Sequence, residues 1–140
     1  MGITLRFKAR YLNKILWRVI FIGLIISLII FLGLKIDITY RYFLSILVIF
    51  FEILIAFYLN KNELEQLIIK EEELKLTFFN KVFFRKKPSD HLKQDLNFKL
   101  NKDIIELYEK NKLIGKIRRT SLDETNWEKL KSYFELNTSK

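Results

Sequence analysis

The sequence predicts an α+β membrane protein, in which a two-helix transmembrane hairpin carries a small antiparallel β domain capped by a C-terminal helix. Hydrophobic residues make up 50% of the 140 residues and charged residues 29%, and the two kinds are segregated along the chain. Residues 19–34 contain no charge, residues 43–59 contain only Glu52, and charges recur every few residues after position 60. Two apolar runs, short alternating runs after them, and a helical apolar stripe near the end together predict this class.

Residues 1–14 form a basic segment in which two patterns compete. A period of two, which is typical of a strand, runs through Ile3, Leu5, Phe7, Ala9 and Tyr11. A basic stripe at steps of four, which is typical of an interfacial helix, runs through Arg6, Arg10, Lys14 and Arg18. We expect a strand over roughly residues 3–8 that pairs with the later sheet, followed by helix from about residue 10.

Residues 15–59 predict the hairpin, with helices over about residues 15–35 and 42–59. Helices of 17 to 20 residues span about 26–30 Å, which matches the hydrocarbon core of a bilayer. Aromatic residues that favour the interface flank both runs: Trp17 and Tyr58 on one side, Tyr40 and Tyr42 on the other. The first run is longer than the apolar part of a signal peptide, and a second run follows directly.

The distribution of lysine and arginine predicts the orientation. Five basic residues precede the first helix, whereas the loop holds only Lys35 and Arg41. The positive-inside rule then places both termini in the cytoplasm and the protein in the inner, cytoplasmic membrane. The net charge of +9 agrees with a protein that faces an anionic inner leaflet.

Glu52 is the most unusual residue of the hairpin, because a carboxylate at mid-bilayer depth is costly. Ser27 lies at a similar depth on the first helix, and Ser45, Glu52 and Ala56 share a face of the second. One interpretation is that a protonated Glu52 hydrogen-bonds Ser27 and locks the hairpin. A contact with another subunit and a proton or ion relay are the alternatives, and two short helices offer few polar groups for a relay.

Residues 60–140 predict a small antiparallel β domain, since short runs alternate with turn signals at roughly ten-residue spacing. The expected strands cover residues 64–69, 74–78, 82–84, 96–100, 104–108 and 113–117. Pro88, Ser89 and Asp90 predict a break in the chain after the third of these.

A C-terminal helix is predicted over residues 122–136. Ser121 and Glu124 have the spacing of a capping box, in which the hydroxyl and the carboxylate each accept a backbone N–H. Trp127, Leu130 and Phe134 follow at helical spacing. We expect Trp127 to close one end of a bent sheet as a core residue rather than to serve as a ligand platform.

The segment Asn111-Lys-Leu-Ile-Gly-Lys-Ile-Arg-Arg-Thr-Ser-Leu-Asp-Glu-Thr-Asn-Trp-Glu-Lys-Leu130 resembles bacterial membrane-anchored pleckstrin-homology-like domains of the YcxB-like family. In that group a strand precedes the hairpin, and the last strand runs through a basic stretch into a capped helix. The resemblance implies a PH-like bent sheet or partial barrel and brings no catalytic residues. The chain lacks the family's Trp-x-x-Ile stretch before the late strands, where residues 91–96 stand instead.

The sequence contains no convincing catalytic constellation, so we predict a protein that is not an enzyme and takes no cofactor or metal. Cysteine is absent and histidine occurs once, which excludes thiolate catalysis and cysteine-based zinc sites. Ser89, Asp90 and His91 are neighbours, and we interpret them as a solvated turn rather than a hydrolase fragment. The acidic run at residues 71–73 lacks the second ligand cluster of a calcium site.

Two basic clusters are candidates for a lipid- or partner-binding surface. They consist of Arg85, Lys86 and Lys87, and of Lys116, Arg118 and Arg119. Near an anionic leaflet each cation contributes about 1 kcal/mol, so binding of anionic lipid headgroups or of a protein partner is the functional interpretation. A merely solvated face is the other interpretation. No nucleic-acid-binding module is evident. The rival function is a membrane-complex subunit or immunity-type protein, an oligomer that uses Glu52 as its contact.

Overall fold

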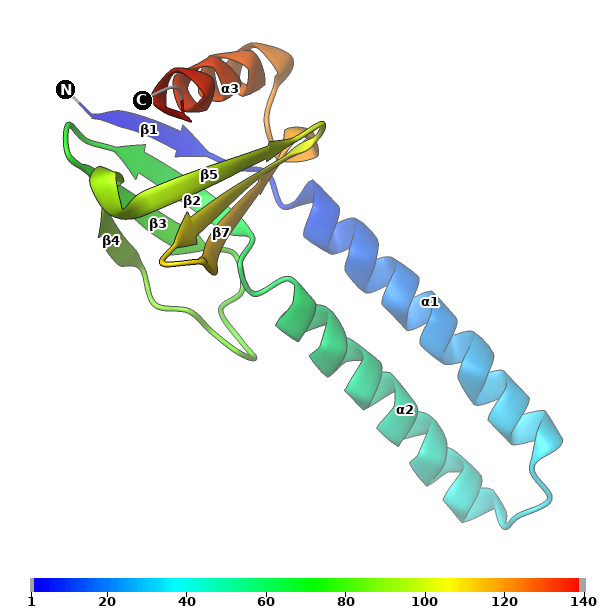
Figure 1. Cartoon of the computed structure of the whole chain (residues 1–140). Coiled ribbons are helices and arrows are strands. Elements are labelled where there is room, and N and C mark those ends of the chain that lie inside the picture. The colour runs from blue at the N-terminus through cyan, green and yellow to red at the C-terminus, as the bar shows by residue number, and fades with distance from the viewer. Residues whose placement is uncertain (1, 139–140) are drawn as a thin grey trace. The chain divides into compact units, whose positions relative to one another are not determined.

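The structure is a computed structural model that describes residues 2–138, and it divides into two compact units. The hairpin unit runs from Leu12 to Asn60. The β unit combines the residues up to Tyr11 with those from Lys61 onward. The hairpin is therefore an insertion between the first and second strands of the β unit, as the expected N-terminal strand requires (Figure 1).

Two long helices form the hairpin, α1 (Arg10–Gly33) and α2 (Ile38–Leu59), and only the first two residues of α1 belong to the β unit. Both are long and apolar enough to cross a membrane. Asp37 caps α2, because its Oδ1 accepts from the backbone N–H of Thr39 at 2.9 Å. Arg41 ties the turn to α1 by donating from Nη1 to the carbonyl of Phe31 at 2.9 Å. α1 begins at Arg10, where helix was expected to begin, and α2 ends at Leu59 as expected but begins at Ile38, earlier than the expected residue 42.

Over the described residues 2–138, the β unit contains two antiparallel sheets and no closed barrel. The first sheet has the order β1-β2-β3-β4, formed by β1 (Ile3–Arg6), β2 (Leu64–Ile69), β3 (Glu73–Phe78) and β4 (Ser89–Leu92). The second has the order β5-β6-β7, formed by β5 (Leu96–Asn101), β6 (Ile104–Glu109) and β7 (Lys112–Arg118). The expected strand at the N-terminus is confirmed, since Ile3 pairs with Ile69 and Arg6 with Gln66.

Turn chemistry fixes the register of β6 and β7. Lys110 and Asn111 form the two-residue connection, and both have a positive φ, at 48° and 66°. A hairpin of this length favours turns with positive φ, because their twist matches that of the strands. The two sheets approach each other closely at Gly115 on β7. A Cβ added there would lie 3.2 Å from a methyl group of Leu64 on β2, so the missing side chain makes room for this contact.

The helix α3 (Glu124–Thr138) completes the β unit beside the two sheets (Figure 1). Trp127 and Phe134 are each only 1% exposed, which confirms Trp127 as a core residue. Phe134 packs on Phe98 of β5 with ring centroids 4.5 Å apart. The core consists of Phe7, Leu64, Leu67, Ile69, Leu74, Leu76, Phe78, Leu96, Ile105, Leu107, Ile114, Ile117, Trp127, Leu130 and Phe134.

Three local predictions were wrong. Residues 82–84 form a loop rather than a strand, and Phe84 has a φ of 55°, which no regular strand accommodates. The predicted break at residues 88–90 overlaps a strand, since β4 begins at Ser89. The capping box does not form either, because α3 begins only at Glu124 and the Glu124 carboxylate pairs with Arg119 at 2.6 Å.

Candidate functional site

Glu52 lies against Gly23 inside the hairpin unit. A Cβ added to Gly23 would be 2.5 Å from Oε2 of Glu52 and 3.2 Å from Ile49. Gly23 is the only buried residue of α1 within the described range Arg10–Gly33. The absence of a side chain on α1 therefore makes room for the carboxyl group of α2, an arrangement that small residues at helix contacts commonly provide.

The expected hydrogen bond between Glu52 and Ser27 is not formed. Among the described residues, Oε2 of Glu52 and the hydroxyls of Ser27 and Ser45 are enclosed and have no hydrogen-bond partner. The structure therefore brings Glu52 to Gly23 and leaves both serine hydroxyls without the role predicted for them. The enclosed oxygen Oε2 therefore contributes to packing inside the hairpin.

Replacing Gly23 with alanine is expected to push the helices apart, because the new methyl group overlaps the space of the Glu52 carboxyl. Gly33→Ala is the matched control, since a Cβ there meets nothing within 4 Å. The chain has no cysteine, so spin labels on cysteines introduced at Arg18 and Tyr58 report the distance between the helices. A longer or broader distance distribution in Gly23→Ala alone is expected. Adding Glu52→Ala to Gly23→Ala should restore the wild-type distance distribution. An unchanged distribution in Gly23→Ala would contradict the packing of Glu52 on Gly23.

The second predicted basic cluster is neutralised by acidic side chains. The Nζ of Lys116 lies 3.4 Å from Glu106. Arg119 pairs with Glu124 at 2.6 Å and with Asp103 at 3.4 Å. Cations that already have carboxylate partners attract an anionic headgroup weakly. As a headgroup-binding surface, this cluster is poorer than its sequence suggested.

Arg118 is part of a buried ion pair. Its Nε donates to Oε1 of Glu63 at 2.8 Å, and the two side chains are 16% and 6% exposed. Its guanidinium carbon also lies 3.5 Å from the ring centroid of Tyr11, a cation–π contact. Burial raises the pKa of Glu63, and the attraction of Arg118 and Lys116 offsets part of that rise. The pair joins the beginning of β2 to the end of β7, so it is a structural element rather than a free binding site.

The first predicted basic cluster lies in the β3–β4 loop, residues 79–88, and its three cations differ. Lys86 turns back onto the β unit: its Nζ bonds Oδ1 of Asn62, bonds the carbonyl of Ile114 at 3.3 Å and lies 5.1 Å from the ring centroid of Phe78. Burial, followed by the repulsion of Lys112 and Lys61, lowers the pKa of Lys86. Arg85 and Lys87 on either side are exposed. Two of the six predicted cations therefore remain at the surface without a carboxylate partner among the described residues.

The apolar tip of this loop was not predicted from the sequence. Val82, Phe83 and Phe84 are 66%, 39% and 49% exposed, although a strand was expected here. Asn80 shapes the turn, since its side-chain amide bonds the carbonyl of Phe83 and its Oδ1 accepts from the N–H of Val82 at 3.2 Å. A usable signal was present in the sequence, because three apolar residues lie directly between an asparagine turn and three cations.

Ser89, His91 and Glu109 form a hydrogen-bonded chain, which corrects the expectation of a solvated turn. Ser89 and His91 lie on the same side of β4, and the hydroxyl is 2.8 Å from Nε2 of the imidazole. Nδ1 of the ring is 3.0 Å from Oε1 of Glu109 at the end of β6. The hydrogen bond from His91 lowers the pKa of Glu109.

The hydrogen-bonded series Ser89–His91–Glu109 has the connectivity of a serine hydrolase triad. It also joins the edge strand of the first sheet to the second sheet. Catalysis requires in addition an oxyanion-stabilising pair of donors and a cavity for substrate beside the serine. What the structure shows of Ser89, His91 and Glu109 is a contact that joins β4 to β6.

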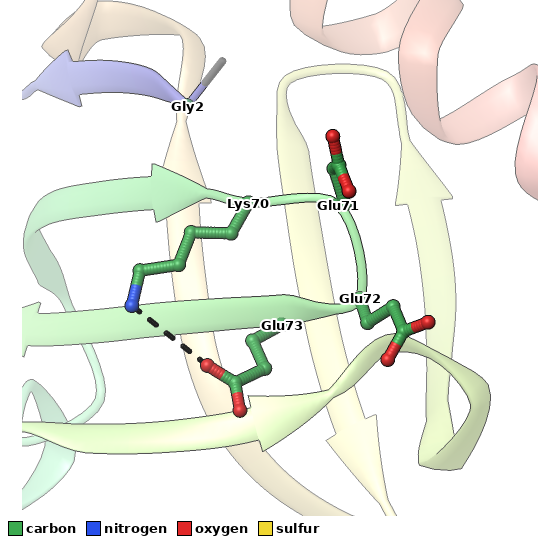
Figure 2. Close-up of a pocket in the computed structure, with 5 residues that line it drawn as sticks. All are labelled: Gly2, Lys70, Glu71, Glu72 and Glu73. Atoms are coloured by element: carbon green, nitrogen blue, oxygen red, sulfur yellow. Dashed lines mark ion pairs between the residues drawn. The ribbon is translucent and has the colours of Figure 1, made fainter.

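An open cavity of about 370 Å³ is lined by Gly2, Lys70, Glu71, Glu72 and Glu73 at the turn between β2 and β3. Figure 2 shows Lys70 reaching to Glu73, 3.8 Å away, while the carboxylates of Glu71 and Glu72 extend from the turn in other directions. A second cavity of about 280 Å³ is lined by Lys93, Gln94, Leu96, Phe98, Tyr133 and Asn137. Within residues 2–138, no group of three or more His, Cys, Asp or Glu side chains could hold a metal ion.

Comparison with known proteins gives no relative from which a role could be transferred to any of these residues. No protein-family model matches the chain, and neither a curated protein nor a solved structure matches it. The function must therefore be argued from the chain's own geometry.

Proposed function

We propose that the chain is an integral protein of the cytoplasmic membrane whose hairpin crosses the bilayer and holds the β unit at the inner surface. The observation that carries this proposal is the exposure of the two apolar helices. Only 6% of the most apolar stretch of α1 and 11% of that of α2 is buried within the protein. A core helix of a soluble protein would be mostly buried, whereas side chains such as Leu32 and Ile46 are 80% and 68% exposed. A bilayer provides the apolar surroundings that these helices lack.

The β unit is proposed to be a PH-like interaction domain. Three features support this proposal: a strand precedes the hairpin, two antiparallel sheets follow it, and the basic end of β7 leads into α3. These are the features that the resemblance to the YcxB-like family implies. The domain acts without catalysis and without a cofactor, and it recruits an anionic lipid or a protein partner through its exposed strand edges and through Arg85 and Lys87.

Protease protection tests the proposed topology. In inside-out vesicles the cytoplasmic face is outside, so added protease is expected to degrade the β unit and leave the hairpin as a protected fragment. In right-side-out vesicles the β unit should survive. Recovery of the full-length chain in the supernatant without detergent would contradict membrane insertion, and the reverse protection pattern would contradict the orientation.

The non-catalytic role has its own test. A fluorophosphonate probe reacts covalently with an activated serine, so we expect no labelling of Ser89 in the full-length protein. Ser89→Ala is the matched control for any background. Labelling that disappears in Ser89→Ala and in His91→Gln would show that the hydrogen-bonded chain is an active site, and the non-catalytic proposal would then be wrong.

A further inference from the structure

We propose that the tip of the β3–β4 loop, residues 82–85, inserts into the interface of the bilayer that holds the hairpin. This inference rests on the proposed membrane insertion of the hairpin and adds a second, peripheral contact to it. The tip exposes Val82, Phe83 and Phe84, and Arg85 follows directly. Aromatic and aliphatic side chains beside cations are the composition that favours the headgroup region of an anionic membrane.

The loop is held in place by contacts at both of its legs. On the first leg, Nζ of Lys81 lies 2.9 Å from Oε2 of Glu65 on β2. On the second leg, Nζ of Lys86 bonds Asn62 and the carbonyl of Ile114. The turn that Asn80 shapes lies between them. The loop is thus fixed at its base, and the apolar tip is presented outward at little further cost in conformational entropy.

The loop also lies at the end of the β unit from which the chain leaves for the hairpin. Asn62, which bonds Lys86, follows directly on Lys61, the first residue of the β unit after α2. The N–H of Phe79 bonds the carbonyl of Glu63 at 3.2 Å.

The other connection leaves from the same end. Tyr11 is the last residue of the β unit before the hairpin, and it stacks on Arg118, which in turn bonds Glu63. If the hairpin spans the membrane, both connections must reach the bilayer surface from this end of the β unit. The loop tip at the same end is then within reach of the headgroups.

Charge distribution supports the same orientation. The cations Arg85 and Lys87 are exposed at the loop, whereas Glu71 and Glu72 are exposed at the turn between β2 and β3. That turn lies at the opposite end of β2, because β2 begins at Leu64 near the hairpin connection and ends at Ile69. An anionic leaflet attracts the first end and repels the second. The occupant of the loop surface is therefore an anionic bilayer rather than a protein.

Site-specific fluorescence in the full-length protein tests the inference. Because the chain has no cysteine, an environment-sensitive fluorophore can be attached at Val82→Cys, Glu71→Cys or Ile46→Cys. Each variant is reconstituted into phosphatidylcholine–phosphatidylglycerol liposomes that contain spin-labelled lipid. We expect blue-shifted, lipid-quenched emission at residue 82 and unshifted, unquenched emission at residue 71. The label at residue 46 reports the hairpin and should be quenched.

The apolar tip is tested by Phe83→Ser with Phe84→Asn in the Val82→Cys background. Asparagine is chosen because it tolerates the positive φ of residue 84. These exposed changes are expected to abolish most of the quenching at residue 82, and the emission of Trp127 in a Trp17→Phe background should remain that of the folded protein. Arg85→Gln with Lys87→Gln should reduce the quenching on anionic liposomes and leave it unchanged on pure phosphatidylcholine.

Each outcome is decisive. Quenching at residue 46 without quenching at residue 82 would overturn the loop inference and leave the membrane anchor intact, as expected if a protein covers the tip instead. Equal quenching at residues 82 and 71 would also overturn it. Absence of quenching at residue 46 would mean that the hairpin is not inserted, and the proposed function itself would fail.

Discussion

Replacing Arg118 with methionine is expected to destabilise the β unit by about 3–5 kcal/mol at neutral pH, because it leaves a buried carboxylate without its partner. Glu63 is only 6% exposed at its side chain and receives its hydrogen bond from Arg118 at 2.8 Å. The stacking of Arg118 on Tyr11 is lost as well. Urea unfolding of the full-length protein in a mild detergent, followed by the emission of Trp127 in a Trp17→Phe background, measures the loss.

The cost of Arg118→Met should depend on pH. Burial already raises the pKa of Glu63 above its usual 4.5, and removal of the arginine raises it further. A carboxyl whose pKa is raised on folding contributes stability that is present below the unfolded pKa and lost as the pH rises through the folded pKa. The deficit relative to the wild type should therefore be smaller near pH 4.5 than at neutral pH. A deficit that is constant over this range would contradict the role of Glu63.

Two variants serve as controls for the ion pair. Arg119→Met removes a neighbouring cation whose side chain is 43% exposed. This variant should show no comparable loss of stability. The double variant Glu63→Leu with Arg118→Met removes both charges, so it should lose less stability than the sum of the single changes, since apolar replacement of a whole buried pair is commonly tolerated. Strict additivity would mean that the two side chains do not interact.

Replacing Trp127 with alanine is expected to cost about 3–5 kcal/mol, the range found when a buried aromatic side chain is truncated. Trp127 is 1% exposed at the first turns of α3, where it closes the core formed by both sheets. The cavity left behind cannot be filled by α3 alone, so both sheets lose contacts at once. Urea unfolding followed by far-ultraviolet circular dichroism measures the effect without a tryptophan reporter.

Trp17→Ala is the matched control, because Trp17 is 73% exposed on α1. Its replacement should change the unfolding of the β unit by no more than about 0.5 kcal/mol, as is usual for exposed positions. Equal losses in the two variants would show that α3 does not close the core of the β unit.

Much of this architecture was predictable from local sequence patterns. Apolar runs long enough to span a membrane predicted α1 and α2, and alternation at Leu74 and Leu76 or at Leu96 and Phe98 predicted β3 and β5. The spacing of Trp127, Leu130 and Phe134 predicted α3 and its buried face. In each case one chain segment contains the whole signal, because the period of hydrophobic residues follows from the geometry of the element itself.

The candidate sites were less predictable, because they depend on partners distant in sequence. Glu52 was expected to bond Ser27, and yet its carboxyl packs on Gly23, since the rotation of each helix about its axis is decided by packing. Residues 82–84 have the composition of a buried strand, but the clamping of Lys86 onto Asn62 and Ile114 holds them at the surface as a loop. Composition alone does not distinguish an apolar segment that finds the core from one that does not.

Local sequence was sufficient to assign the three long helices and most strands, because the period of apolar residues follows from the order of residues within about ten positions. It failed at residues 82–84 and at β4. Which charges remain available at the surface depends instead on the tertiary structure. Arg118 and Arg119 are paired with carboxylates from other elements, whereas Arg85 and Lys87 remain exposed. The physical reason is that the free energy of a charge depends on the groups that folding brings within a few ångströms of it, wherever they stand in the chain.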